Sequence, residues 1–165
     1  MPVIRERRFL RVKLDMVTRC QLRCIMCHFA HPHFVANKTQ MGPELLDKVG
    51  NDLFPRAHDV VLSSSAEPLL AKELPRALEL CRKHDVPNFH FSTNAMALNQ
   101  RIMDKIIEVQ MPLLTISCDG GTKETFERVR TPAKWEKLMA AFDLIAETKK
   151  RTGSPFPRLS MTAVL

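Results

Sequence analysis

Apolar positions along this chain recur with two different spacings. Some short runs are apolar or alternate with polar residues, as in a strand, whereas longer stretches carry apolar residues every three or four positions, as on one face of a helix. The runs of strand type are 9–16, 60–62, 89–91, 113–116 and 158–165. The stretches of helix type lie between them at 42–54, 73–84, 99–107, 122–129 and 131–153.

Two of the predicted helices have clear end signals. Asn99 is a residue type that caps a helix start, and Gly153 follows the longest apolar stripe of the chain. Thr131-Pro132 is predicted to open that longest helix, because proline suits the first helical turn. Strands that alternate with helices indicate βαβ units, so the pattern predicts an α/β fold in which helices cover a parallel sheet.

Polar residues follow most of the predicted strands directly. In parallel α/β folds the C-terminal ends of the strands form the functional site. The sequence has no GxGxxG motif and no phosphate-binding loop. No short motif therefore supports a dinucleotide-binding fold. A length of 165 residues corresponds to one domain, and we treat 1–165 as a single unit.

Composition narrows the functional classes. The formal net charge is +7, but the cations are dispersed, with modest concentrations only at 5–13 and 149–151. Nucleic-acid binding is therefore not favoured. No apolar run approaches the length of a membrane span, and the first residues lack the apolar core of a signal peptide. We expect a cytoplasmic protein without a membrane partner, in which the five cysteines stay reduced.

Three of the cysteines form a tight group after the first predicted strand. Cys20, Cys24 and Cys27 are spaced as C-x3-C-x2-C. Thiolates this close repel one another unless a cation or a cluster neutralises them. A structural zinc ion or a simple electron-carrying iron–sulfur cluster usually takes four protein ligands. Three cysteines instead suit a [4Fe–4S] cluster that keeps one iron open.

A zinc site is the alternative interpretation. His28, His31 and His33 follow the last of the grouped cysteines and could supply a fourth zinc ligand. Contact with solvent is the simpler expectation for loop histidines, and a role beside the open iron or the substrate is the more specific one. The two remaining cysteines, Cys81 and Cys118, are predicted to be small buried side chains.

The cysteine motif, with the apolar Met26 before its last cysteine, resembles the signature of the radical S-adenosylmethionine (SAM) superfamily. The resemblance extends over 10–165 and implies a partial (β/α) barrel with about five βα units. It also implies that Cys20, Cys24 and Cys27 hold a [4Fe–4S] cluster, whose open iron binds the amino and carboxylate groups of SAM.

Two further motifs strengthen the resemblance. Ser65-Ala66-Glu67-Pro68 occupies the place of the superfamily's Gly-Gly-Glu-Pro, where the backbone and the glutamate hold the SAM amino group. Neither glycine is present, and an ordinary helix start is the alternative. Ser92-Thr93-Asn94-Ala95 resembles the Thr-Asn-Gly segment near the SAM ribose and carboxylate. Strand alternation puts Ser92 and Asn94 on the cavity face and Thr93 on the other face.

A third motif, Ser117-Cys118-Asp119-Gly120, resembles the Ser-x-Asp-Gly segment of the peptide-modifying, SPASM-type branch of the superfamily. The resemblance implies that Ser117 contacts the SAM carboxylate or ribose. Asp119 is predicted either to face the same cavity or to shape the turn before Gly120. Arg130, toward which the motif continues, pairs either with the SAM carboxylate or with a structural acid.

The resemblance implies an enzyme that reductively cleaves SAM to methionine and a 5′-deoxyadenosyl radical, which takes a hydrogen atom from a substrate such as a peptide. A flavodoxin or ferredoxin would supply the electron. The alternative is a truncated or non-catalytic protein with a structural metal site. A complete eight-unit barrel needs about 250 residues. We therefore expect only the N-terminal part of the barrel, without a sixth unit or a C-terminal auxiliary-cluster domain. A further segment or a partner is expected to cover the last strand.

Overall fold

One parallel sheet carries the fold of this computed structural model, which describes residues 8–34 and 39–164. The strands lie in the order β1-β2-β3-β4-β5, so strands that follow each other in the chain are neighbours in the sheet. Their bounds are Leu10–Lys13 for β1, Ala57–Val61 for β2, Asn88–Thr93 for β3, Leu113–Ser117 for β4 and Arg158–Thr162 for β5. The predicted parallel α/β architecture with five strands is confirmed.

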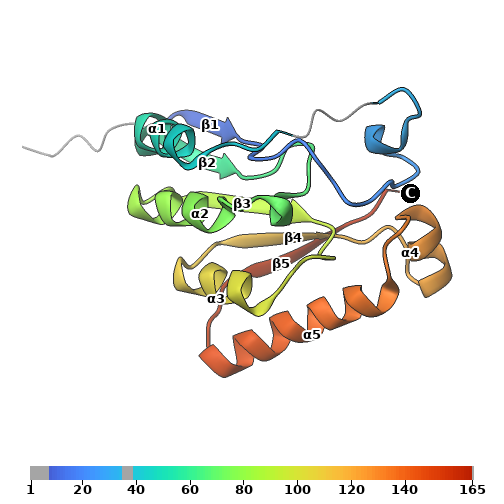
Figure 1. Ribbon diagram of the computed structural model, residues 1–165. Coiled ribbons are helices and arrows are strands. Elements are labelled where there is room, and N and C mark those ends of the chain that lie inside the picture. The colour runs from blue at the N-terminus through green and yellow to red at the C-terminus, as the bar shows by residue number, and fades with distance from the viewer. Residues whose placement is uncertain (1–7, 35–38, 165) are drawn as a thin grey trace, which may run out of the picture.

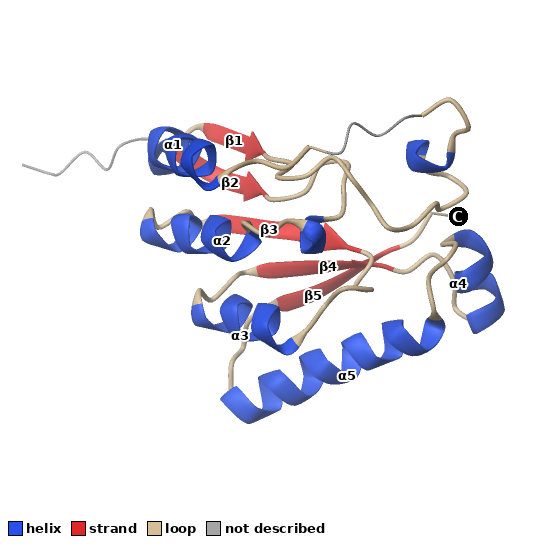
Figure 2. Cartoon of the chain, in the orientation of Figure 1, coloured by secondary structure: helices blue, strands red, loops and turns tan. Residues whose placement is uncertain are grey.

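The helices connect the strands along one side of the sheet (Figures 1 and 2). Neighbouring helices pack against each other in chain order, α1 on α2, α2 on α3 and α3 on α5. The α-helices are α1 (Pro43–Leu53), α2 (Leu74–Lys83), α3 (Gln100–Glu108), α4 (Lys123–Val129) and α5 (Trp135–Thr152). Short 3-10 turns lie at His28–Ala30, Phe54–Arg56 and Pro68–Leu70. None of the helices in the described ranges is long and apolar enough to cross a membrane.

The predicted helix ends are partly confirmed. The side chain of Asn99 accepts a hydrogen bond from the Ile102 amide at 3.2 Å and caps α3. Gly153 ends α5 with a φ of +65°, a conformation that favours glycine. The predicted start of α5 was wrong, because the helix begins at Trp135 rather than at Thr131-Pro132. The Thr131 carbonyl instead accepts a hydrogen bond from the Arg23 amide and holds the cysteine loop.

Alternation along the strands separates an apolar face from a polar one. Phe91, Leu114 and Ile116 point toward the helices and are fully buried. Ser92 and Ser117, on the opposite face, stay partly exposed or exposed. The main core therefore lies between the sheet and the helices, and the other face of the sheet is polar.

The last strand keeps its apolar side open. Leu159 and Met161 pair in register with Leu114 and Ile116, yet they are 44% and 66% exposed. The strand ends at Thr162, before the end of the predicted run at 165, and Leu165 lies outside the described residues. The apolar face predicted for this strand is thus present, and in the described part of the chain no helix packs over it.

Candidate active site

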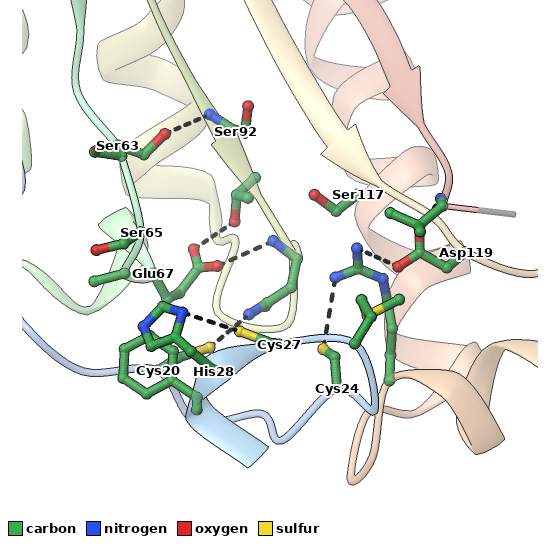
Figure 3. Close-up of a pocket in the computed structure, with 18 residues that line it drawn as sticks. Cys20, Cys24, Cys27, His28, Ser63, Ser65, Glu67, Ser92, Ser117 and Asp119 are labelled. Atoms are coloured by element: carbon green, nitrogen blue, oxygen red, sulfur yellow. Dashed lines mark hydrogen bonds and ion pairs between the residues drawn. The ribbon is translucent and has the colours of Figure 1, made fainter. Parts of the chain in front are cut away.

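A cavity of about 470 Å³ opens at the C-terminal ends of the strands and brings the sequence motifs together (Figure 3). Every residue predicted to bind the cluster or SAM lines it: Cys20, Cys24, Met26, Cys27, Ser65, Ala66, Glu67, Ser92, Asn94, Ser117, Asp119 and Arg130. These residues lie at the ends of the four strands β1 to β4 or in the segments that follow them. Their convergence is what the topology of a parallel sheet requires of residues at the strand ends.

Backbone hydrogen bonds hold the cysteine loop against the end of α4. The Arg23 amide donates to the Thr131 carbonyl at 2.6 Å, and the Ile25 amide donates to the Val129 carbonyl at 3.0 Å. A tight turn, closed by the Cys27 amide on the Cys24 carbonyl at 2.8 Å, follows them. The loop is therefore fastened on both sides of Cys24, and the turn that follows places Cys27.

The three thiols of the motif are free, and the pKa values of two of them, Cys20 and Cys24, are shifted by burial. Burial raises the pKa of the Cys20 thiol, although the Leu22 amide partly offsets this shift. Burial also raises the pKa of the Cys24 thiol, and the nearby Arg130 guanidinium opposes this effect. Partly buried thiols that disfavour negative charge suit a site in which a cationic cluster compensates them.

The three histidines that follow the cysteine motif do not all reach the cysteine cavity. Within residues 8–34 and 39–164 no three His, Cys, Asp or Glu side chains are grouped to hold a single metal ion. His28 lines the cavity, with its Nδ1 atom 3.8 Å from the Cys27 sulfur, whereas His31 and His33 are exposed. Zinc needs its ligands within about 2.3 Å of one point. Of the three histidines considered as zinc ligands, only His28 lines the cysteine cavity.

Glu67 lies in the cavity wall with its carboxylate held by three donors. It is 3% exposed. Its Oε1 accepts from the Thr93 hydroxyl at 2.5 Å and from the Leu69 amide at 3.2 Å, and its Oε2 accepts from the Asn94 amide at 3.0 Å. Burial raises the pKa of this carboxyl group. Glu67 therefore both starts the turn at Pro68–Leu70, as the alternative predicted, and places a carboxylate at the cavity.

Thr93 lines the cavity as well, which corrects the prediction that it faces away. The alternation rule fails there because β3 ends at Thr93 and the chain then turns. Ala95, two residues later, has a φ of +64°. This left-handed conformation favours glycine, and the superfamily motif carries glycine at the matching position. The Asn94 side chain also donates toward the Cys20 sulfur at 3.6 Å.

Asp15 is a site residue that the sequence analysis missed. Its Oδ1 accepts from the Ser64 amide at 2.8 Å, and its Oδ2 accepts from the Ser65 amide at 3.0 Å and the Ser65 hydroxyl at 2.9 Å. Neither Ser65 nor Ala66 has a positive φ, so the loop conformation does not need the superfamily's glycines. An acid near the end of the strand-type run 9–16, in the segment that leads to Cys20, was the available sequence signal.

Asp119 and Arg130 form a nearly buried ion pair. The distance between Asp119 Oδ2 and Arg130 Nη2 is 2.6 Å, and their side chains are 1% and 11% exposed. Asp119 Oδ1 also accepts from the Val164 amide at 2.8 Å. Arg130 thus pairs with a structural acid, one of the two predicted alternatives. Its Nη1 lies 3.9 Å from the Cys24 sulfur.

The other residues of the Ser117–Gly120 motif, and the cysteine Cys81, lie either at the cavity or in the core. The Ser117 side chain faces the cavity (Figure 3), and in the described part of the chain its hydroxyl has no hydrogen-bond partner. Gly120 has no room for a side chain, because a Cβ there would collide with the Phe126 backbone nitrogen. Cys81 is fully buried, as predicted, whereas Cys118 is only partly buried.

Residues 14–155 match the family model of the radical SAM superfamily. The chain belongs to this superfamily. The match includes the cysteine loop and the motifs after the later strands. The family prediction made from the C-x3-C-x2-C spacing is therefore confirmed.

Curated proteins with similar sequences include two longer proteins. The chain is 27% identical over 116 residues to Fe-coproporphyrin III synthase from Methanosarcina barkeri, covering 70% of this chain and 28% of that protein. It is 23% identical over 125 residues to a probable GTP 3',8-cyclase from Methanocaldococcus jannaschii, covering 76% of this chain and 41% of that protein. The chain spans less than half the length of these relatives.

Solved structures share the fold. The structure of anSMEcpe with bound AdoMet superposes with a TM-score of 0.71 at 19% identity, over 92% of this chain and 43% of that chain. The structure of SuiB from Streptococcus suis, bound to S-adenosylmethionine, superposes with a TM-score of 0.69 at 11% identity. The match covers 93% of this chain and 32% of the SuiB chain. At such low identity the likeness concerns the fold, and it confirms the partial radical SAM barrel.

Proposed function

We propose that this chain is the core of a radical SAM enzyme, with a [4Fe–4S] cluster on Cys20, Cys24 and Cys27 and SAM bound beside it. The observation that carries the proposal is that the three thiols and the motif residues after the later strands line one cavity. When bound, the cluster supplies the electron that splits SAM into methionine and a 5′-deoxyadenosyl radical, which takes hydrogen from the substrate.

Glu67 is suited to hold the ammonium group of SAM. Three donors already fix its carboxylate in place, so little rotamer freedom remains to be lost on binding. A carboxylate facing an ammonium in a partly closed cavity makes a charge-assisted hydrogen bond. The positive charge would also offset the burial that raises the pKa of this carboxyl group.

The other cavity residues orient the rest of the ligand. The Ser117 hydroxyl and the side-chain amide of Asn94 can bind the SAM carboxylate or ribose. Met26 contributes an apolar surface at the cavity edge. Arg130 contributes its charge: the ion pair with Asp119 holds the Arg130 guanidinium so that its Nη1 atom lies 3.9 Å from the Cys24 sulfur.

The proposal also includes a substrate and an electron donor for the whole protein. The related structures include anSMEcpe with a bound peptide and SuiB bound to the precursor peptide SuiA. A peptide is therefore one candidate substrate class, and a flavodoxin or ferredoxin is the candidate donor. An oxygen-sensitive cluster would place the protein in the reducing cytoplasm.

Anaerobic reconstitution with iron and sulfide, followed by electron paramagnetic resonance (EPR) of the reduced protein with and without SAM, tests this function. We expect a reduced-cluster signal that changes shape when SAM binds the open iron. A structural metal protein would give a signal that SAM leaves unchanged. Protein that takes up about one zinc ion and no sulfide would refute the enzyme proposal.

A further inference from the structure

A second cavity, of about 340 Å³, lies on the polar face of the sheet toward the N-terminal ends of the strands. Its ionisable lining consists of Arg11, His58, Asp59, His90 and Arg158. It shares no lining residue with the cysteine cavity. No sequence motif pointed to it, because its lining is drawn from all five strands, which are far apart in the chain.

The charges of this cavity do not balance. Asp59 is the only acid in the five strands, and it is already engaged. Its Oδ2 lies 2.7 Å from Arg11 Nε, and its Oδ1 lies 3.5 Å from His90 Nε2. The guanidinium of Arg158 makes no hydrogen bond or ion pair with any residue that the structure describes. The Nδ1 atom of His90 is buried and likewise lacks a partner in the described residues.

The cavity adjoins the cysteine cavity along the sheet. His90 lines the second cavity, and Ser92, two residues farther along β3, lines the first. Two residues of a parallel strand span about 6.6 Å, and their side chains point to the same face. Leu113 and Ser117 stand in the same relation on β4, about 13 Å apart. A molecule of modest size can therefore reach from one cavity to the other.

We propose that the second cavity binds an acidic group of the substrate, a carboxylate or a phosphate, and that Arg158 is its principal anchor. This inference rests on the proposed function. A guanidinium matches the geometry of both anions through paired hydrogen bonds, and the surplus positive charge selects for them. With its acidic end at Arg158, the substrate extends along the polar face and presents its hydrogen-donating part beside Ser92 and Ser117.

Anaerobic calorimetric titration of the purified chain with inorganic phosphate and with succinate tests this site. Arg158→Gln is expected to weaken binding of the preferred anion by roughly tenfold or more. Asp59→Asn is expected to tighten binding, because it frees the Arg11 charge. Arg101→Gln is the matched control, since Arg101 is an exposed arginine of α3 that lies outside the cavity.

The two anions separate the two substrate classes. Tighter phosphate binding identifies a phosphorylated substrate, and tighter succinate binding identifies a carboxylic acid. The proposal is overturned if neither anion binds saturably, if Arg158→Gln binds as the unchanged chain does, or if Arg158 mediates self-association instead. The titration needs neither cluster nor SAM. Its failure beside an intact SAM-dependent EPR change would therefore remove this inference and leave the proposed function standing.

Discussion

The proposed cluster should depend on each of the three thiols of the motif. Replacing Cys20, Cys24 or Cys27 by alanine should abolish iron and sulfide binding, because a cubane with two protein ligands is poorly held. Cys81→Ala and Cys118→Ala are matched controls outside the cavity and should leave the iron content unchanged. Iron and sulfide analysis after anaerobic reconstitution measures the effect. A stable cluster in any of the first three variants would contradict the ligand assignment.

SAM affinity should depend most directly on the carboxylate of Glu67. Glu67→Gln should keep the cluster but weaken SAM binding roughly ten- to a hundredfold, since one charge-assisted hydrogen bond contributes about 1.5–3 kcal/mol. Titration of the SAM-dependent EPR change gives the affinity. Glu147→Gln, an exposed acid on α5, is the control. Unchanged SAM affinity in Glu67→Gln would show that Glu67 starts a turn but does not bind SAM.

At the scale of an element, the loop after β2 depends on Asp15. Asp15→Asn removes the charge that accepts from the Ser64 and Ser65 amides, and the loop that carries Glu67 should then lose order. We expect roughly tenfold weaker SAM binding with unchanged iron content, in line with about 1.5 kcal/mol for a lost charged acceptor. Asp143→Asn on α5 is the exposed control. Equal SAM affinity in both variants would show that Ser64 and Ser65 hold the loop without Asp15.

The turn after β3 carries a local strain that glycine should relieve. Ala95 has a φ of +64°, and a non-glycine residue in this region costs about 1 kcal/mol. Ala95→Gly should therefore be neutral or stabilise the protein by up to about 1 kcal/mol. Ala140→Gly, in the exposed face of α5, should destabilise it by about 1 kcal/mol. Denaturant unfolding measures the free energy of unfolding of both variants. An equal loss of stability in Ala95→Gly and Ala140→Gly would contradict the left-handed conformation assigned to Ala95.

At the scale of the whole molecule, the open side of β5 should drive association. Met161 is 66% exposed on an apolar strand face, and β5 pairs only with β4 among the described strands. We expect the purified chain to self-associate, and Met161→Lys to shift it toward the monomer. Leu45→Lys, at an apolar α1 position that is 53% exposed, is the control. Sedimentation that shows a monomer at every concentration would contradict this prediction.

Local patterns in the sequence were sufficient for the architecture. Strand-type and helix-type spacing predicted five parallel strands and the helices between them, and Asn99 and Gly153 marked helix ends correctly. The start of α5 was misplaced, because Thr131 serves the cysteine loop through a hydrogen bond to Arg23 that no local spacing reveals.

The sequence by itself also determined the candidate site, since the cysteine spacing and three short motifs follow strand ends that a parallel sheet must bring together. Only the tertiary structure decided how that site is built. Asp15 reaches a loop 49 residues away, and Arg130 pairs with Asp119 beside Cys24. The cationic cavity around Arg158 likewise depends on strand register. Such contacts join distant segments through packing, and packing leaves no periodic signal in the chain.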